Sequence, residues 1–289
     1  MDNFVIVTDS SADLPSEYIK EHGIFTMSLL YTIDGETYNS DDEEAAKTFY
    51  DKVRAGSMPT TSQVNPENAG IAIKKALEVS KNVLCISFSS GLSGTYNSIR
   101  IAAEDIMDDN KDANIIVVDS LAASMGEGLL VHKAVMMKES GSTLEETAKW
   151  IEDNKNHLVH IFTVSDLFHL YRGGRVKKAA AIVGSIINLK PILVVDNEGH
   201  LNNVMTVRGR NKSLRTMISM MEEKMGSYKD MNDIVFISHC DAKEDAETVA
   251  LEIKEKFGIE NILINTIGPT IGAHSGPDTV AIFFMGEEK

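Results

Sequence analysis

The segment SFSSGLSGTYNSIR, residues 87–100, carries the side chains best suited to chemistry in this sequence. Ser93 lies one residue away from the G-x-S-x-G pattern of serine hydrolases, but Thr95 stands where that pattern needs its second glycine. A phosphate-binding P-loop is also excluded, because no lysine follows the glycine. Two interpretations remain: a hydroxyl that caps the following helix, or one that holds an anion at the positive end of that helix.

Three further loops bring residues that suit an anion. Hydroxyls crowd Pro59–Gln63, which by itself is more typical of a helix cap. His274 lies within the glycine- and proline-rich loop GPTIGAHSGP, residues 268–277. Two arginines flank the glycine pair of YRGGR, residues 171–175, and guanidinium groups suit carboxylate or phosphate.

The elements that must position these loops follow an α/β pattern. Short β-branched runs alternate with amphipathic helical patterns in the first half, which predicts a mainly parallel sheet with flanking helices. The expected strands there are Phe4–Thr8, Val83–Phe88, Ile115–Asp119 and, more weakly, Phe25–Tyr31. Helices are expected from Pro66 to about Val79 and over Ser142–Asn156, with Asn65 and Ser142 or Thr143 as caps.

The second half predicts a mixed sheet with helices. The turn residues Asn197-Glu198-Gly199 separate two apolar runs, which indicates a hairpin and therefore antiparallel pairing. We therefore expect two α/β domains, residues 1–157 and 158–289, with a ligand between them.

Composition narrows the function classes. A net charge of −15 over 289 residues argues against nucleic acid as a partner. Cys85 and Cys240 form neither a disulfide framework nor a C-x-x-C motif, and no metal-binding cluster is visible. The first residues do not resemble a signal peptide and no apolar run reaches the length of a membrane span, so a cytoplasmic location is expected.

Taken together, these loops resemble the DegV family of bacterial lipid-binding proteins. The resemblance rests on eight motifs in order along the chain: VTDSSADLP at 7–15, TSQ at 61–63, SSGLSGTYNS at 89–98, VVDSLAASMG at 117–126, YRGGR at 171–175, LKPIL at 189–193, VRGR at 207–210 and GPTIGAHSGP at 268–277.

The resemblance implies that one long-chain fatty acid, such as palmitate, binds between two α/β domains without a cofactor or a metal. Thr61 and Ser93 would hydrogen-bond the carboxylate. His274, which would be neutral or charged near pH 6–7, and an arginine of the RGGR segment would lie near the head group. The expected site residues are Thr61, Ser93, Gly94, Arg175, Gly272 and His274.

The resemblance also implies a non-catalytic role beside a separate ATP-dependent fatty acid kinase subunit. The protein would present the fatty acid to that subunit and then carry the acyl phosphate. Transient contact with a membrane is compatible with this role. Six basic residues either dock an acidic partner or are simply exposed charges at helix ends: Arg172, Arg175, Lys177, Lys178, Arg208 and Arg210. The alternatives are a serine hydrolase, or a phosphoryl-transfer protein that uses Ser93 and His274.

Overall fold

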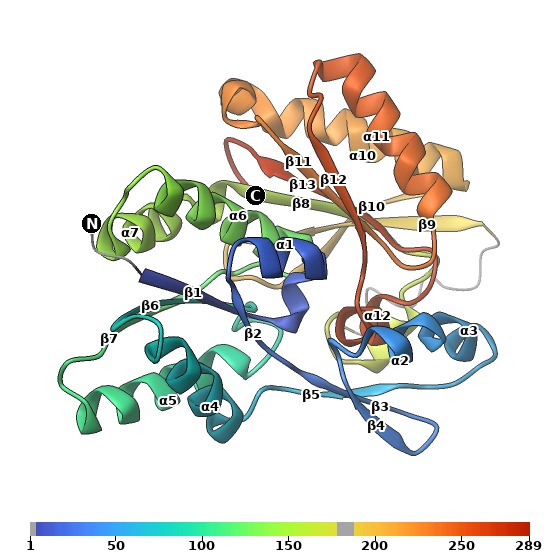
Figure 1. Cartoon of the computed structure of the whole chain (residues 1–289). Helices are drawn as coiled ribbons and strands as arrows, with labels where there is room; N and C mark the ends of the chain where they lie inside the picture. The colour runs from blue at the N-terminus through green and yellow to red at the C-terminus, as the bar shows by residue number, and fades with distance from the viewer. Residues whose placement is uncertain (1–3, 178–187) are drawn as a thin grey trace.

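Within residues 4–177 and 188–289, which the computed structural model describes, the strands form three sheets (Figure 1). The first is wholly parallel in the order β2-β1-β6-β7. Its strands are β1 Phe4–Asp9, β2 Phe25–Met27, β6 Asn82–Ser87 and β7 Asn114–Asp119. The predicted parallel sheet of the first half is confirmed.

Helices cover both faces of this parallel sheet, as its apolar strands require. Helices α4 and α5 contact one face and α6 and α7 the other (Figure 1). Their bounds are α4 Pro66–Leu77, α5 Thr95–Asp109, α6 Met125–Glu139 and α7 Leu144–Asn154. The predicted caps are present: the Asn65 side chain accepts from the Asn68 N–H, and Thr143 forms a capping box with Glu146.

The second sheet is mixed, with the order β10-β9-β8-β13-β11-β12; β11 and β12 pair in parallel, and the other described pairs are antiparallel. Its strands are β8 Leu158–Thr163, β9 Leu189–Val195, β10 Leu201–Arg208, β11 Val235–His239, β12 Ile262–Thr266 and β13 Val280–Met285. The predicted hairpin joins β9 to β10, and Gly199 adopts a φ of 77° in its turn.

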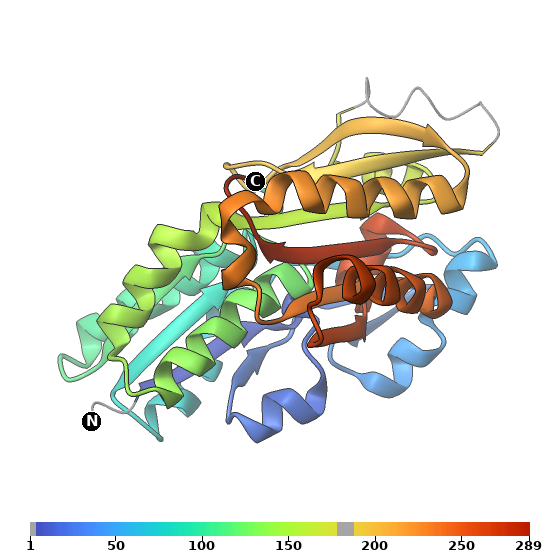
Figure 2. The same ribbon diagram turned by 90° about the horizontal axis from the view of Figure 1, so that it is seen from above.

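Helix α6 lies between the two large sheets, because it contacts β1 and β6 of the parallel sheet and β8, β11 and β13 of the mixed one. Helices α10, Arg210–Met225, and α11, Lys243–Phe257, cover the outer face of the mixed sheet (Figures 1 and 2). The core around α6 is therefore shared by residues from both halves of the chain, among them Phe4, Phe162 and Phe283.

A third, antiparallel sheet in the order β4-β3-β5 was not expected. Its strands are β3 Leu30–Ile33, β4 Glu36–Asn39 and β5 Thr60–Ser62, and two short helices, α2 Glu43–Lys47 and α3 Phe49–Arg54, lie between β4 and β5. The predicted single strand Phe25–Tyr31 was wrong, because the chain leaves the parallel sheet after Met27 and enters this small sheet at Leu30.

The small sheet packs against the C-terminal half of the chain. Tyr31, Phe49 and Tyr50 share a buried cluster with Ile267 and Ala273, on either side of the start of α12, Pro269–Ser275. Two further short helices are α1 Ser16–Glu21 and α8 Phe168–Arg172. The parallel sheet lies before residue 157 and the mixed sheet after it, while the division into domains at that residue remains a prediction.

Among the helices of the described residues, none combines the length and the apolar character needed to cross a membrane.

Candidate functional site

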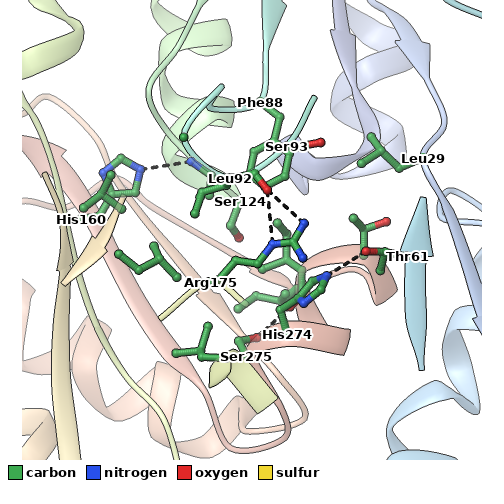
Figure 3. A pocket seen from close by; sticks show the side chains of 18 of the residues that line it. Leu29, Thr61, Phe88, Leu92, Ser93, Ser124, His160, Arg175, His274 and Ser275 are labelled. Carbon is green, nitrogen blue, oxygen red and sulfur yellow. Dashed lines mark hydrogen bonds between the residues drawn. The ribbon is translucent and has the colours of Figure 1, made fainter. Parts of the chain in front are cut away.

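A cavity of about 460 Å³ opens between the loops at the ends of β5 and β6 and the inner face of the mixed sheet (Figure 3). Thr61, Ser93, Gly94, Arg175 and His274, five of the six predicted site residues, line it. Most of the remaining wall is apolar and includes Phe88, Phe162, Leu170, Val195, Leu201 and Phe283. The cavity therefore joins a polar cluster to a hydrocarbon-like space.

Ser93 precedes α5 and takes part in its N-terminal turn. The Ser93 Oγ accepts a hydrogen bond from the Thr95 N–H at 3.2 Å and lies 2.9 Å from the Thr95 Oγ1. Thr95 is fully buried, and its Oγ1 accepts from the Val64 N–H at 3.3 Å. The N-cap of α5 is Gly94, without a side-chain cap, so the predicted capping role of Ser93 was wrong; its hydroxyl accepts the Thr95 N–H just before the helix and lines the cavity.

The side chains of Thr61 and His274 are hydrogen-bonded to each other at the wall of the cavity. The Thr61 Oγ1, on β5, lies 2.8 Å from the His274 Nε2, on α12, as Figure 3 shows. The His274 Nδ1 is buried, and no hydrogen-bond partner for it lies within residues 4–177 and 188–289. Burial, followed by the nearby charges of Arg175 and Arg172, lowers the pKa of His274 to about 3. Of the two states expected near pH 6–7, burial therefore favours the neutral imidazole.

Arg175 lies beside this pair but uses its donors on the backbone. Its Nε and Nη2 donate to the Leu92 carbonyl oxygen at 3.2 and 3.0 Å, and its Nη1 donates to the Gly173 carbonyl oxygen at 2.6 Å. Arg172 likewise donates to the carbonyl oxygens of Pro59 and Ala273. In the described part of the chain, no carboxylate pairs with either guanidinium, so the positive charge at this end of the cavity favours an anion.

Glycines allow the loops around the cavity to approach closely. A Cβ on Gly94 would lie 2.2 Å from the Gln63 Oε1, and the Gln63 Nε2 donates to the Ser98 Oγ at 3.0 Å. A Cβ on Gly91 would lie 2.7 Å from the carbonyl oxygen of Glu198 in the β9–β10 turn. The Ser93 loop thus packs closely against Gln63, which follows β5, and against the β9–β10 turn from the second half of the chain.

Gly272 is the exception among the predicted site residues. It lies on α12 but does not line the cavity, because its Cα faces the ring of Tyr50, whose hydroxyl would be 2.4 Å from an added Cβ. Its role is therefore close packing of α12 against α3. Gln63, which follows Thr61 in the TSQ motif, also lines the cavity and was not among the predicted site residues.

His160 lies across the cavity from the Thr61–His274 pair (Figure 3). It is buried on β8, where its ring meets Phe283 edge-on at 5.3 Å and its Nε2 accepts from the Ala123 N–H at 3.4 Å. Burial lowers the pKa of His160 well below its usual range. This wall therefore carries no charge, in contrast to the wall that bears Arg175.

The geometry does not favour nucleophilic catalysis by Ser93. A nucleophilic serine needs a general base within hydrogen-bond reach, and the His274 ring is bonded to Thr61 instead. In residues 4–177 and 188–289, no group of three or more His, Cys, Asp or Glu side chains is arranged to hold a metal ion.

The predicted basic group is divided in the structure. Arg172 and Arg175 turn toward backbone carbonyls, whereas Arg208 is exposed on β10. Arg210 pairs with Asp245 through its Nε at 2.8 Å. Lys178 lies outside the described residues.

Comparison with known proteins agrees with this architecture. The family model described as "Uncharacterised protein, DegV family" matches residues 3–287. A DegV domain-containing protein of Clostridium perfringens is 44% identical over 291 aligned residues, which cover 100% of this chain and 99% of the relative.

Solved structures show the same fold. The fatty-acid-binding DegV family protein of Thermus thermophilus is 28% identical with a TM-score of 0.87, over 98% of this chain and 99% of that one. DegV of Bacillus subtilis, a fatty acid binding protein, is 28% identical with a TM-score of 0.84, over 99% and 100% of the two chains. Because the family model matches almost the entire length of this chain, the chain belongs to the DegV family.

Proposed function

We propose that this protein binds one long-chain fatty acid, with the acyl tail along the apolar wall and the carboxylate at the Thr61 and Ser93 hydroxyls. The observation that carries the proposal is the division of one cavity into an apolar space and a polar end. This end contains two hydroxyls and Arg175, which has no carboxylate partner among the described residues. The fatty acids bound by the DegV proteins of Thermus thermophilus and Bacillus subtilis support the same ligand class.

The energetics assign affinity to the tail and orientation to the head group. Burial of about fourteen methylenes contributes roughly 11 kcal/mol before the cost of immobilising the ligand. A buried carboxylate without partners costs several kcal/mol. Each hydrogen bond to it restores roughly 1.5–3 kcal/mol, so two hydroxyl donors offset most of that cost. A ligand with a tail but no anion would bind without a preferred direction.

We extend the proposal to a carrier role in the cytoplasm. A separate ATP-dependent kinase subunit would phosphorylate the bound carboxylate: a carboxylate oxygen attacks the γ-phosphorus, ADP leaves, and the acyl phosphate remains on this protein. Uncharged hydroxyl donors suit this step, because a tight bidentate arginine would stabilise the unreacted carboxylate. The bonds from Arg175 to Leu92 and Gly173 keep its guanidinium engaged with the backbone.

The test is to extract the purified protein with organic solvent, identify any released lipid by mass spectrometry, and titrate the stripped protein with hexadecanoate. We expect stoichiometric fatty acid and saturable binding. Absence of both would refute the carrier function. Failure of phosphorylation by the kinase, with binding intact, would remove only the kinase step.

A further inference from the structure

Two contacts with Thr95 restrict where the hydroxyl proton of Ser93 can point. The Ser93 Oγ already accepts the Thr95 backbone N–H, which occupies one of its two acceptor positions. The Thr95 Oγ1 already accepts the Val64 N–H. The donor is still undetermined in the 2.9 Å hydrogen bond between the Ser93 Oγ and the Thr95 Oγ1, because either hydroxyl can donate.

Burial decides between these two directions. If Ser93 donated to Thr95, the proton of the Thr95 hydroxyl would need another acceptor, and none contacts it among the described residues. Thr95 is fully buried, so an unpaired hydroxyl there carries the full desolvation cost. Thr95 therefore donates to Ser93, both acceptor positions of the Ser93 Oγ are filled, and its own proton is directed elsewhere.

The same reasoning applies to Thr61. The neutral His274 carries one ring proton, and its buried Nδ1 has no hydrogen-bond partner in the described part of the chain. A proton on Nδ1 would be a buried, unpaired N–H, whereas a proton on Nε2 is donated to the Thr61 Oγ1 at 2.8 Å. In that tautomer Thr61 also accepts from the protein, and its hydroxyl proton is available to a ligand.

We propose that Thr95 is a positioning residue that makes Ser93 a hydrogen-bond donor only, so that this end of the cavity selects ligands by the polarity of their head group. His274 fills one of the two acceptor positions of the Thr61 Oγ1 and leaves the Thr61 proton to the ligand, so both hydroxyls donate to head groups that accept hydrogen bonds, such as a carboxylate or an acyl phosphate. The Ser93 position rejects head groups that also donate, such as a primary amide. This inference rests on the proposed function.

The test compares hexadecanoate with hexadecanamide, which share a tail and differ in the head group. Dissociation constants for both ligands are measured for the wild type, Thr95→Val and Thr95→Ser by displacement of a fluorescent fatty acid. Valine keeps the shape of threonine without the hydroxyl, and serine keeps the hydroxyl. We expect the wild type and Thr95→Ser to prefer the acid strongly, and Thr95→Val to lose that preference by about tenfold or more.

The ratio of the two constants separates positioning from general damage, because a loosened fold weakens both ligands equally. An unchanged ratio in Thr95→Val would overturn the inference, as would a wild type that binds acid and amide alike. If Thr95→Val does not fold, Thr95→Ala gives the same comparison. A wild type that binds neither ligand would instead contradict the proposed function.

Discussion

The Thr61 Oγ1 lies 2.8 Å from the His274 Nε2, although 213 positions separate the two residues in the chain. Thr61 arrives on the small antiparallel sheet and His274 on α12, which pack against each other. Arg54 strengthens this junction, because it pairs with Asp241 at 2.8 Å and Asp278 at 2.6 Å in the C-terminal half. The polar end of the cavity is thus an assembly of both halves.

The first prediction concerns the two head-group hydroxyls. Thr61→Val and Ser93→Ala should each weaken hexadecanoate binding about tenfold or more, because each removes a hydrogen bond to a charged group worth roughly 1.5–3 kcal/mol. Isothermal titration measures the effect. Thr60→Val is the matched control, since Thr60 is exposed on the same strand and lies outside the cavity. If the control lost as much affinity as the variants, the hydroxyls would have no special role.

The second prediction concerns the close approach at Gly91. Gly91→Ala should displace the Ser93 loop and weaken fatty acid binding, because the new Cβ would lie 2.7 Å from the backbone carbonyl oxygen of Glu198. Gly70→Ala is the control: it lies in α4 with no atom within 4 Å of an added Cβ. That substitution should raise stability by roughly 0.5–1 kcal/mol. Thermal unfolding and titration of both variants provide the comparison, and equal binding by the two would contradict this prediction.

The third prediction concerns the pH dependence of stability. Burial raises the pKa of Asp13 to about 7, despite hydrogen bonds from Ser124 and Gly268 that oppose the shift. The unfolded carboxyl ionises near pH 4, whereas the folded one retains its proton up to about pH 7. Asp13 therefore favours the folded state at low pH, and this contribution is lost as the pH rises from about 4 to 7.

Asp13→Asn should remove that dependence. Over this window the slope of unfolding free energy against pH should change by up to about 1.4 kcal/mol per pH unit relative to the wild type. Urea unfolding at several pH values measures the slope. Asp9 and Glu127 also have raised pKa values because of burial, so only the difference between variant and wild type reports on Asp13. If the unfolding free energies of the variant and the wild type changed in parallel between about pH 4 and 7, Asp13 would be ionised in the folded state over that range and its pKa would not be raised.

The fourth prediction concerns the proposed kinase partner. Arg208 is exposed on β10, and Arg208→Ala should slow acyl phosphate formation by the kinase while hexadecanoate binding stays unchanged. Hydroxylamine trapping of the acyl phosphate measures the rate. Arg100→Ala removes a partly exposed arginine that pairs with Glu104 on α5 and serves as the control. Loss of fatty acid binding in Arg208→Ala would mean that this arginine is structural.

Arg210 should behave differently from Arg208. It pairs with Asp245 and joins the start of α10 to α11. Its replacement by alanine should lower thermal stability modestly, by about 1 kcal/mol or less for a partly exposed pair. Asp245→Ala should produce a similar loss, and the double variant should lose little more than either single one.

Local sequence signals predicted the elements whose ends are determined by neighbouring residues. Asn65 and Pro66 mark the start of α4, Thr143 and Glu146 cap α7, and the residues around Gly199 form the hairpin turn. The strand predicted over Phe25–Tyr31 failed because nothing local shows that the chain changes sheets after Met27. That exchange depends on burial of Tyr31 against Phe49 and on contacts with residues far along the chain.

The sequence by itself determined the loops that form the site, because glycine, hydroxyl and arginine types restrict what those loops can bind. It did not determine which residues face the cavity or what they bond: Gly272 packs against Tyr50, and Arg175 donates to the carbonyl oxygen of Leu92. Nor did it determine the charge of His274 or the direction of the Ser93 proton. Those properties depend on burial and on hydrogen-bond partners brought together by packing, which only the tertiary structure decides.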